Sequence, residues 1–474
     1  MATPFALVRR LAAAWRGASP RKRHFAKNVA IGLVISIGLS FAESNAVVAK
    51  LRDAILSMQV AQFGGTGVAP DVLWLDVDEA TYRRWHAPPV TPRDRICRLI
   101  DFAVRGSARV VVVDIDVTRP SSSSAFPPLE SCSPASGPVG RAARTADDEL
   151  NEYLHRHARA CHAGAHGHCT PIVLTRELRT SFQSAYADGA AARVPRESFI
   201  ENVPLGRDAA VVWSAPNFDF DDDAIIRRWR LWEPVCDPPA VVGSTELLAA
   251  GLFAGRRVGD LQTALDELTP QCVSNHAAAP AASPRREVDL DIGYRLHLTT
   301  DSLERRFFYR IAWDAARGRP SMAAFVPAHL ITEADPQHPF DPAIAAGRVV
   351  VIGGSYADNP DFHRTPLGTM PGSLVLINAI EALITDDHVR ESPWWLRILV
   401  EAVLVAFVAG LFLYLRPQRA MLASSVLVAG LAMTAGYLFL DRGYWIDPVL
   451  PLVGIQLHEL LAIIEHRAKT EGTS

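Results

Sequence analysis

Long apolar runs near both ends of the chain constrain its architecture most. LRILVEAVLVAFVAGLFLYL at 396–415 and AMLASSVLVAGLAMTAGYLFL at 420–440 each match the ~20 residues that a membrane-spanning helix needs. NVAIGLVISIGLSFA, within 27–43, is close to the minimum length, and the run at 444–464 is interrupted by polar residues and prolines. We therefore expect transmembrane helices at 27–43, 394–415, 420–440 and 444–464.

Basic residues give these spans an orientation. The segment 1–26 is rich in Lys and Arg and has no acid, RPQR at 416–419 is also basic, and the tail at 465–474 contains Arg467 and Lys469. The excess of positive charge on cytoplasmic segments then places 45–392 outside the membrane. We expect a multi-pass protein of a bacterial inner membrane with a large periplasmic or extracellular domain. The alternative for 27–43 is the core of a cleaved signal peptide.

The cysteines fit an oxidising compartment. All six of them fall within 45–392, where disulfides form readily. Cys161 and Cys169 enclose a tight loop and are the first pair that we expect, and Cys236 with Cys272 is the second. Cys97 lies on an apolar helical face and is either a buried free thiol or part of a bridge. The net charge of −3 over 474 residues does not suggest a nucleic-acid partner.

Strand-like and helical runs alternate through the outer region. The strand-like runs are 72–78, 110–117, 171–178, 209–216 and 348–354, and the helical runs are 92–106, 145–161, 246–255 and 373–385. A further run, 225–235, alternates strongly and suggests one antiparallel strand. The repetition predicts an α/β extracytoplasmic domain with a mostly parallel sheet, accompanied by one N-terminal and three C-terminal transmembrane helices.

The segment GRVVVIGGSYADNPDFHRTPLG at 347–368 joins a buried strand to a polar loop. Ligands of open α/β sheets bind at the carboxyl ends of the strands, and glycines there permit positive φ and close approach. The candidate ligand-binding residues are Gly353, Gly354, Ser355, Asp361, His363 and Thr365. The alternative is that Asp361 and His363 only fix the path of the loop.

Two other strands end in paired acids. DVD and DID supply Asp76, Asp78, Asp114 and Asp116, which would meet at one edge if their strands were neighbours. Mutual repulsion raises a carboxyl pKa unless a cation separates the groups, and Arg93 is the candidate cation, with Arg95 and Arg119 as others. These acids either line a polar ligand pocket or cap helices. No activated nucleophile accompanies them, so we do not expect an enzyme.

Two segments raise the question of a metal. The acidic run at 218–228 lacks the glycine and terminal Glu of an EF-hand loop, so a solvated turn explains it equally well. Five histidines crowd the stretch between residues 155 and 168 and include ligand types that Zn²⁺ and Cu²⁺ accept. Neither segment has a fixed ligand spacing, so we predict no metal and no cofactor.

The motifs together resemble the CHASE2 family. WLDVDEAT at 74–81 and VVVVDIDVTRP at 110–120 match its early strands. The segment 349–384 matches its Gly turn, its Asp-x-His-x-Thr-Pro loop and its Asn-Ala helix. The resemblance implies an extracytoplasmic sensory domain between an N-terminal anchor and about three closing membrane helices. Family members commonly carry a cytoplasmic output domain, whereas this chain ends soon after the last expected span.

The expected function is therefore that of a membrane-anchored sensor. It would bind an unknown extracytoplasmic ligand and pass a signal through its membrane helices to a separate cytoplasmic or membrane partner, as a monomer or a homodimer. One alternative is a structural or assembly subunit of a bacterial envelope complex. The other is an extracytoplasmic hydrolase that uses the Asp and His side chains of the sheet edge.

Overall fold

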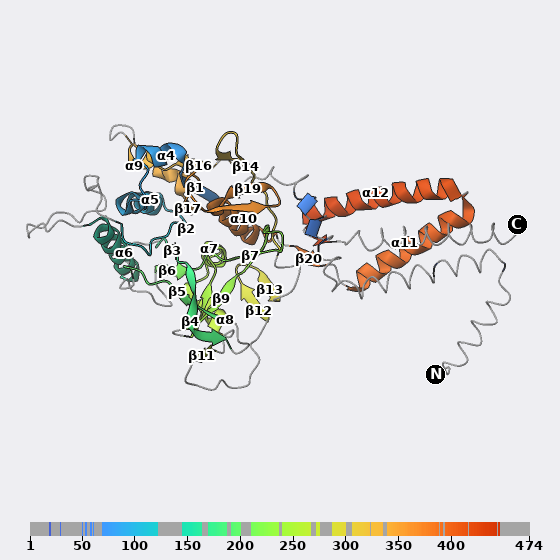
Figure 1. The fold of residues 1–474 in the computed structure, drawn as a ribbon, viewed down its shortest axis with the longest axis horizontal. Coiled ribbons are helices and arrows are strands. Elements are labelled where there is room, and N and C mark those ends of the chain that lie inside the picture. The colour runs from blue at the N-terminus through green and yellow to red at the C-terminus, as the bar shows by residue number, and fades with distance from the viewer. Residues whose placement is uncertain are drawn as a thin grey trace, which may run out of the picture. The chain divides into compact units, whose positions relative to one another are not determined.

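The computed structural model describes the chain in segments (Figure 1). These are residues 19, 29, 50, 53–54, 57–58, 60, 69–121, 145–163, 169–186, 191–200, 210–236, 239–266, 272–274, 287–299, 306–322, 324–334, 339–387, 389–391, 394–415, 417–442 and 444–445. The chain forms two compact units, one of residues 60–388 and one of residues 1–59 with 389–474.

A six-stranded parallel sheet forms the centre of the 60–388 unit. Its strands are β1 (Val72–Val77), β2 (Val110–Val113), β3 (Ile172–Thr175), β6 (Val211–Ser214), β16 (Phe325–Pro327) and β17 (Val349–Gly354). Their order is β16-β1-β17-β2-β3-β6, and all five pairings are parallel. β1, β2, β3 and β17 are buried along their whole length, as β-branched strands covered on both faces should be. The prediction of a mostly parallel α/β sheet is confirmed.

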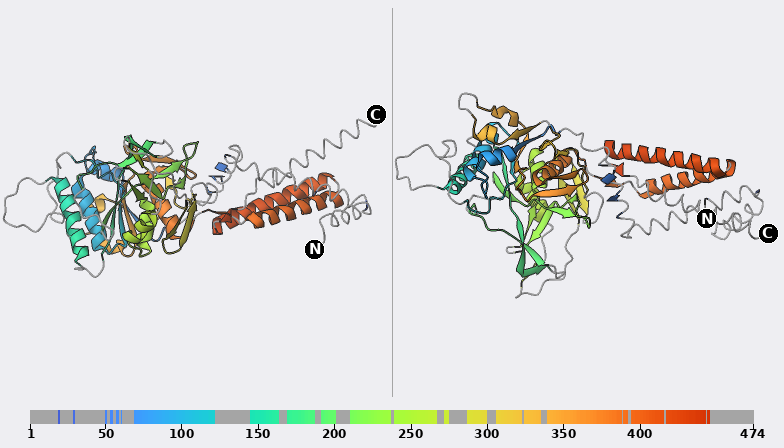
Figure 2. Two further views of the ribbon diagram at one scale, coloured as in Figure 1. Left: turned by 90° about the horizontal axis from the view of Figure 1, so that it is seen from below. Right: turned by 45° about the horizontal axis from the view of Figure 1, so that its top comes forward.

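Helices cover both faces of this sheet (Figure 2). α5 (Arg93–Arg105) and α6 (Ala146–His162) pack on one face, where Leu73, Val111 and Ile352 belong to the main apolar core. α7 (Thr245–Phe253) and α10 (Gly372–Ile384) pack together on the other face and contact β2, β3 and β17. Successive strand residues point to opposite faces, so each strand contributes to both layers.

Local sequence explains where two of these helices begin and end. Thr145 caps α6 in a capping box with Asp148, as its position before an acidic first turn predicts. α5 ends at Gly106, where a Cβ atom would lie 2.1 Å from the carbonyl oxygen of Pro342. Only glycine allows the 3-10 turn η3 (Pro342–Ala345) to pack this closely against the end of α5.

Smaller elements surround the sheet. The helices are α4 (Glu79–Arg84), α8 (Val258–Asp266) and α9 (His329–Thr332). A three-stranded sheet contains β4 (Leu178–Tyr186), β5 (Ala191–Pro195) and β11 (Cys272–Ser274). The strand pairs are β7 (Phe218–Phe220) with β8 (Ile226–Trp229), β9 (Trp232–Val235) with β10 (Ala240–Gly243), β12 (Glu287–Asp291) with β13 (Arg295–Thr299), β14 (Trp313–Asp314) with β15 (Arg319–Pro320) and β18 (Phe362–Thr365) with β19 (Gly368–Pro371).

The single antiparallel strand predicted at 225–235 is wrong in one respect, because β8 and β9 divide that run and pair with different partners.

The second unit contains two long helices, α11 (Trp394–Tyr414) and α12 (Pro417–Arg442). Two short parallel strands, β20 (Arg390–Glu391) and β21 (Tyr444–Trp445), belong to the same unit. The helices coincide with the runs predicted at 394–415 and 420–440. Among the residues that the structure describes, no helix combines the length and the apolar character that a membrane span requires. The predicted spans 27–43 and 444–464 lie almost entirely outside the described residues.

Cys161 and Cys169 form a disulfide, as predicted. It ties the last turn of α6 to the approach of β3. Cys97 and Cys236 are also disulfide-bonded, so of the two alternatives for Cys97 the structure has the bridge. The side chain of Cys272 lies outside the described residues, and its pairing with Cys236 stays a prediction.

Candidate functional site

The carboxyl edge of the sheet contains a topological switch point. β1 and β2 are each followed by a helix on the α5/α6 face, whereas β17, which lies between them, is followed by α10 on the opposite face. Chains that leave neighbouring strands toward opposite faces open a crevice at the strand ends, where ligands of such sheets bind. The loops after β1, β17 and β2 carry most of the residues that the sequence singled out.

Asp76 ends β1 beside Gly353 of β17 and is fully buried. Its Oδ2 accepts a hydrogen bond of 2.5 Å from the Ser355 hydroxyl, while its Oδ1 has no hydrogen-bond partner. Burial raises the pKa of Asp76 well above its ordinary value, the Ser355 bond opposes that shift, and the charge of Asp78 adds to it. The buried Asp76 carboxyl is therefore either protonated or able to accept a hydrogen bond from a bound ligand through its Oδ1.

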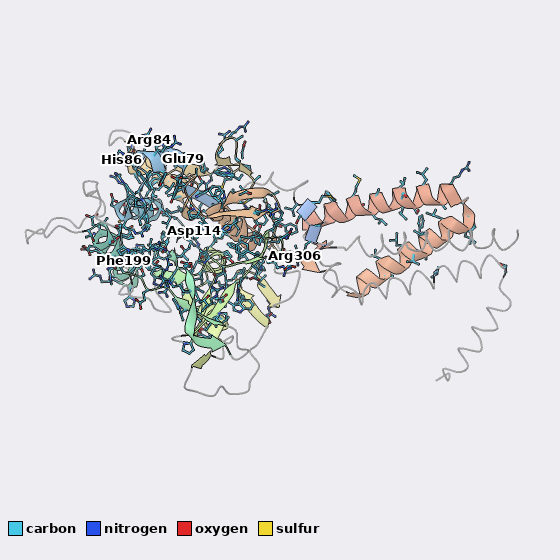
Figure 3. The ribbon with its side chains drawn as sticks, viewed as in Figure 1. Glu79, Arg84, His86, Asp114, Phe199 and Arg306 are labelled. Carbon is cyan, nitrogen blue, oxygen red and sulfur yellow. A yellow bond between two sulfur atoms is a disulfide. The ribbon has the colours of Figure 1, made fainter. Side chains whose placement is uncertain are left out.

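Asp114 follows β2 on the other side of β17 (Figure 3). Its Oδ2 accepts a hydrogen bond of 2.7 Å from the hydroxyl of Ser373, in the first turn of α10. Burial and the charge of Asp361 raise the pKa of Asp114 to about 7, although the Ser373 bond and His363 oppose the shift. Asp76 and Asp114 thus lie at the same edge of the sheet, with β17 between their two strands.

Glu246, which the sequence interpretation missed, is a fully buried acid in the first turn of α7. Neither of its carboxyl oxygens has a hydrogen-bond partner. Burial raises the pKa of Glu246 to about 8, and the charge of Asp114 adds to this shift. Its own backbone amide and the Ser244 hydroxyl oppose the shift as polar neighbours, although neither reaches hydrogen-bond geometry with the carboxyl oxygens. The signal in the sequence was STE at 244–246, which reads equally as an ordinary helix cap and acidic first turn.

Asp361 and His363 form the more exposed part of this edge. His363 Nε2 lies 2.7 Å from Asp361 Oδ1, and the two side chains are 26% and 46% exposed. The Asp361 carboxylate lies against Gly372 at the start of α10, where a Cβ atom would be 2.0 Å from Oδ2. The predicted pair is therefore brought together, and both of its members lie close enough to Asp114 to act on its pKa.

The two glycines serve close approach. A Cβ atom on Gly353 would lie 2.1 Å from the Ser373 hydroxyl, so glycine lets α10 reach the strand. The carbonyl of Gly354 accepts a hydrogen bond of 3.0 Å from the Asn359 side chain. Neither glycine has a positive φ, so of the two reasons that the sequence suggested for glycine here, positive φ and close approach, only close approach holds.

Asp78 and Thr365 have structural roles. Asp78 caps α4 by accepting a hydrogen bond of 2.8 Å from the Thr81 amide, which is the capping alternative for the strand-end acids. Thr365 donates to the Gly368 carbonyl at 2.7 Å and accepts from the Leu367 amide at 3.2 Å. These bonds close the β18–β19 turn.

Arg93 does not lie between the strand-end acids. It is fully buried at the start of α5, and its terminal nitrogens donate to the carbonyls of Thr91, Asp116 and Arg119. Its Nε is 3.8 Å from Asp147 on α6. Arg93 therefore fastens the loop after β2 to α5 and α6, and burial lowers its pKa.

The Asp116 side chain is bound within the same loop. Its Oδ1 accepts from the Thr118 amide and hydroxyl, and its Oδ2 is 3.2 Å from Arg196. Burial raises the pKa of Asp116, but the Thr118 bonds and the charges of Arg196 and Arg119 outweigh burial and hold the pKa below its ordinary value. Asp116 is thus an ionised carboxylate with its own partners.

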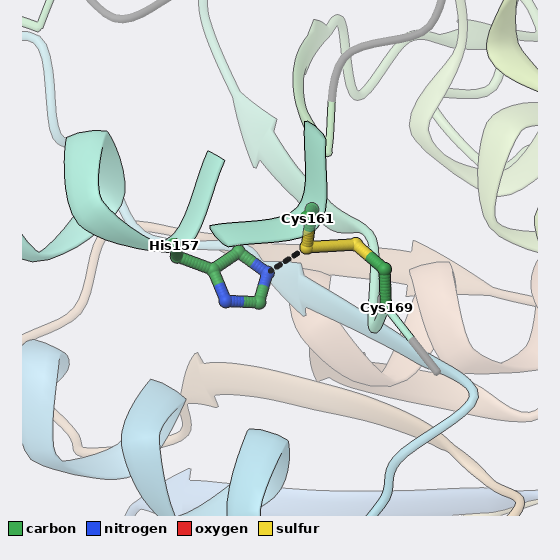
Figure 4. A group of neighbouring side chains, drawn as sticks. All are labelled: His157, Cys161 and Cys169. Atoms are coloured by element: carbon green, nitrogen blue, oxygen red, sulfur yellow. Dashed lines mark hydrogen bonds between the residues drawn. A yellow bond between two sulfur atoms is a disulfide. The ribbon is translucent and has the colours of Figure 1, made fainter. Parts of the chain in front are cut away.

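In both segments considered for a metal, the candidate ligand side chains make other interactions. Arg227 binds Asp221 at 2.7 Å and both carboxylate oxygens of Asp223 at 2.9 and 2.7 Å, so the acidic run forms a salt-bridged hairpin. Among the described residues, His157, Cys161 and Cys169 bring metal-ligand atoms within 4.8 Å of one another (Figure 4). Both sulfur atoms are consumed by the disulfide, which removes the thiolates that a metal would need.

One of the three comparisons with known proteins finds a match. The family model described as the CHASE2 domain matches residues 29–415. No curated protein and no solved structure matches the chain.

Proposed function

Because the chain belongs to the CHASE2 domain family, a family of sensory domains, we propose that it is a membrane-anchored sensor that binds a ligand at the carboxyl edge of its parallel sheet. The ligand would reach the domain outside a bacterial inner membrane. The signal would pass to a separate cytoplasmic or membrane partner, with the chain acting as a monomer or a homodimer. We propose binding and no catalysis.

The observation that carries this proposal is a pair of buried acids at the topological switch point whose hydrogen-bonding capacity is not filled. Asp76 and Glu246 are fully buried and keep three carboxyl oxygens without a hydrogen bond. Buried polar groups are normally satisfied within a protein, and an unsatisfied one costs about 1–3 kcal/mol. A ligand that supplies donors would recover that free energy.

α10 connects this edge to the rest of the chain. In its first turn, the Ser373 hydroxyl donates a hydrogen bond to Asp114. In its middle, Asn378 Oδ1 accepts hydrogen bonds of 2.9 Å from the backbone amides of Arg310 and Ile311. The helix ends at Ile384, and the sequence then leads to α11 at Trp394. A ligand that moved Ser373 would move this rigid helix and bias a two-state equilibrium in the segments that follow it.

Membrane anchoring is supported by the surface of α11 and α12. Large apolar side chains are exposed on both helices: Leu399, Val403, Phe407, Tyr414, Leu422, Val426, Met433 and Tyr437. Apolar surface of this extent needs a lipid or protein partner. An alkaline phosphatase fusion after residue 300 should be active and one after Arg419 inactive. The reverse pattern would contradict the proposed orientation.

The sensory proposal is tested by thermal-shift screening of the full-length protein in detergent against metabolites. A ligand should raise the melting temperature of the parent protein, and Ser373→Ala should reduce that increase. The matched control is Asp260→Asn, which removes an exposed acid on α8 and should leave the increase intact.

Two other outcomes would replace the sensor. Stable envelope partners that co-purify without regard to ligand would identify an assembly subunit. Substrate turnover by the purified protein, lost in Asp361→Ala and in His363→Ala, would identify a hydrolase.

A further inference from the structure

The polar edge between α7 and α10 gathers acids almost exclusively, so its charge is strongly one-sided once these acids ionise. Four elements contribute acids to it: β1 gives Asp76, the turn after β2 gives Asp114, α7 gives Glu246 and the turn before β18 gives Asp361. His363 is the basic partner that the described contacts bring to this group. Such an arrangement repels anions and attracts cations, most strongly where the carboxyls are shielded from water.

Two arginines that lie next to strands of this region are directed elsewhere. Arg176 follows β3 and stacks over the Trp213 ring at 4.9 Å, and Trp213 packs on the core of the α5/α6 face. Arg364 follows His363 on β18 and donates to the Asp223 carbonyl. The described contacts therefore give no arginine to Glu246 or to Asp76.

The unpaired atoms are nearly all acceptors when the acids are ionised. Both oxygens of Glu246 and Oδ1 of Asp76 lack donors. A protonated amine carries several donors in a compact, positively charged group, and charge-assisted bonds to carboxylates are about twice as strong as neutral ones. Amine and carboxylates are thus complementary in both charge and hydrogen bonding.

The spacing of the acids disfavours a bare metal ion. Within the described residues, the sole group of three ligand atoms within 4.8 Å of one another is the one at His157, so the sheet-edge acids do not converge in that way. Asp76 and Asp114 flank β17, and two strand spacings separate their backbones by about 9–10 Å. Ca²⁺ needs six to eight oxygens at about 2.3–2.6 Å, which requires much closer carboxyls.

We propose that the ligand of this edge is an organic cation that carries at least one primary or secondary ammonium group, an inference that rests on the proposed sensory function. The ammonium reaches the half-exposed Asp361 and Asp114 first, and Glu246 lies behind them as the buried counter-charge. An organic body between two ammonium groups matches carboxyls that stand apart.

Binding of such a cation expels protons. Below neutral pH, Asp114 and Glu246 hold protons in the empty site, because burial and mutual repulsion favour their neutral forms. The ammonium stabilises the carboxylates, and the protons leave to solvent. Affinity therefore rises with pH, by about tenfold per pH unit for each proton released.

Isothermal titration of the full-length protein in detergent tests the ligand class. The probes are 1,4-diaminobutane, the matched neutral 1,4-butanediol, MgCl₂ and CaCl₂. We expect saturable binding of the diamine alone, at least tenfold weaker in Glu246→Gln and in Asp114→Asn and unchanged in Asp260→Asn. Titration at pH 6 and pH 7, in two buffers of different ionisation enthalpy, should report the released protons.

Three results would overturn the proposal. Equal binding of butanediol would show that charge is irrelevant, and binding of Mg²⁺ or Ca²⁺ with the same sensitivity to Glu246→Gln would identify an inorganic cation. A ligand without an amine could also raise the melting temperature of the parent protein but not that of Ser373→Ala. That result would rule out an ammonium ligand and would still support the sensory function. If no compound depends on these edge residues, both proposals fail together.

Discussion

Two fully buried charged groups, one on each face of the central sheet, have very different hydrogen bonding. On the α5/α6 face, the guanidinium of Arg93 is fully buried and donates to three backbone carbonyls. On the α7/α10 face, Glu246 is buried as completely and accepts no hydrogen bond. The first charge belongs to the architecture, since its partners come from the chain itself. The Glu246 carboxyl has two oxygens without hydrogen-bond donors, and only a proton or a ligand can satisfy them.

Removal of Arg93 should have the largest effect on stability. Arg93→Met keeps most of the side-chain volume but removes the hydrogen bonds to the carbonyls of Asp116 and Arg119 and leaves Asp147 without its buried cationic neighbour. We expect a loss of about 3–5 kcal/mol in the free energy of unfolding, measured by urea denaturation. An unchanged urea midpoint would mean that these contacts do not hold the loop after β2.

Glu246→Gln should change the pH dependence of stability. The folded carboxyl keeps its proton until pH about 8, whereas an ordinary glutamate loses it near 4.5. The folded state therefore binds more protons between these values, and stability falls as pH rises through this window, by an amount on the order of a few kcal/mol. The glutamine variant should lose much of that slope in unfolding curves recorded from pH 5 to pH 8. Equal slopes in the two proteins would contradict a buried, neutral Glu246.

Gly353→Ala should strain the contact between β17 and α10. The new methyl group would overlap the Ser373 hydroxyl, and overpacking of this kind costs about 1–3 kcal/mol. Addition of Ser373→Gly removes the overlapping side chain and should restore part of the melting temperature. A double variant no more stable than Gly353→Ala would place the strain elsewhere.

Asp78→Ala should have the smallest effect. The substitution removes the cap of α4 and should cost about 1 kcal/mol, while Asp78→Asn keeps a capping oxygen and should cost less. Asp78 acts on the ligand site only through its charge on Asp76, so both variants should change ligand affinity far less than Glu246→Gln does. Binding weakened as much as in Glu246→Gln would place Asp78 in the ligand site.

Much of the fold could be predicted from local pattern. The runs at 72–78, 110–117, 171–178, 209–216 and 348–354 became β1, β2, β3, β6 and β17, since continuous β-branched stretches have few alternatives to a buried strand. Strand order could not be predicted, because the pairing of β17 with β1 and β2 depends on packing across most of the domain. That one placement separates Asp76 from Asp114 and brings α10 against the edge.

The candidate site was predicted in part for the same reason. Asp76, Asp114, Ser355 and Asp361 fall at the ends of recognisable strands and reach the crevice. Asp116 also follows a strand, and Arg93 begins α5, but both side chains already make hydrogen bonds to the backbone of the loop after β2. Glu246 has an unremarkable sequence context, and only the burial of α7 against β2 and β3 distinguishes it.

The central position of β17 has a consequence for how the domain matures. Its two neighbours, β1 and β2, come early in the chain, and β17 comes near the end of the domain. Until those late residues arrive, β1 and β2 each keep an unpaired edge, which invites wrong partners. We expect slow assembly dominated by long-range pairing, and a truncated or stalled chain that lacks 349–354 should aggregate.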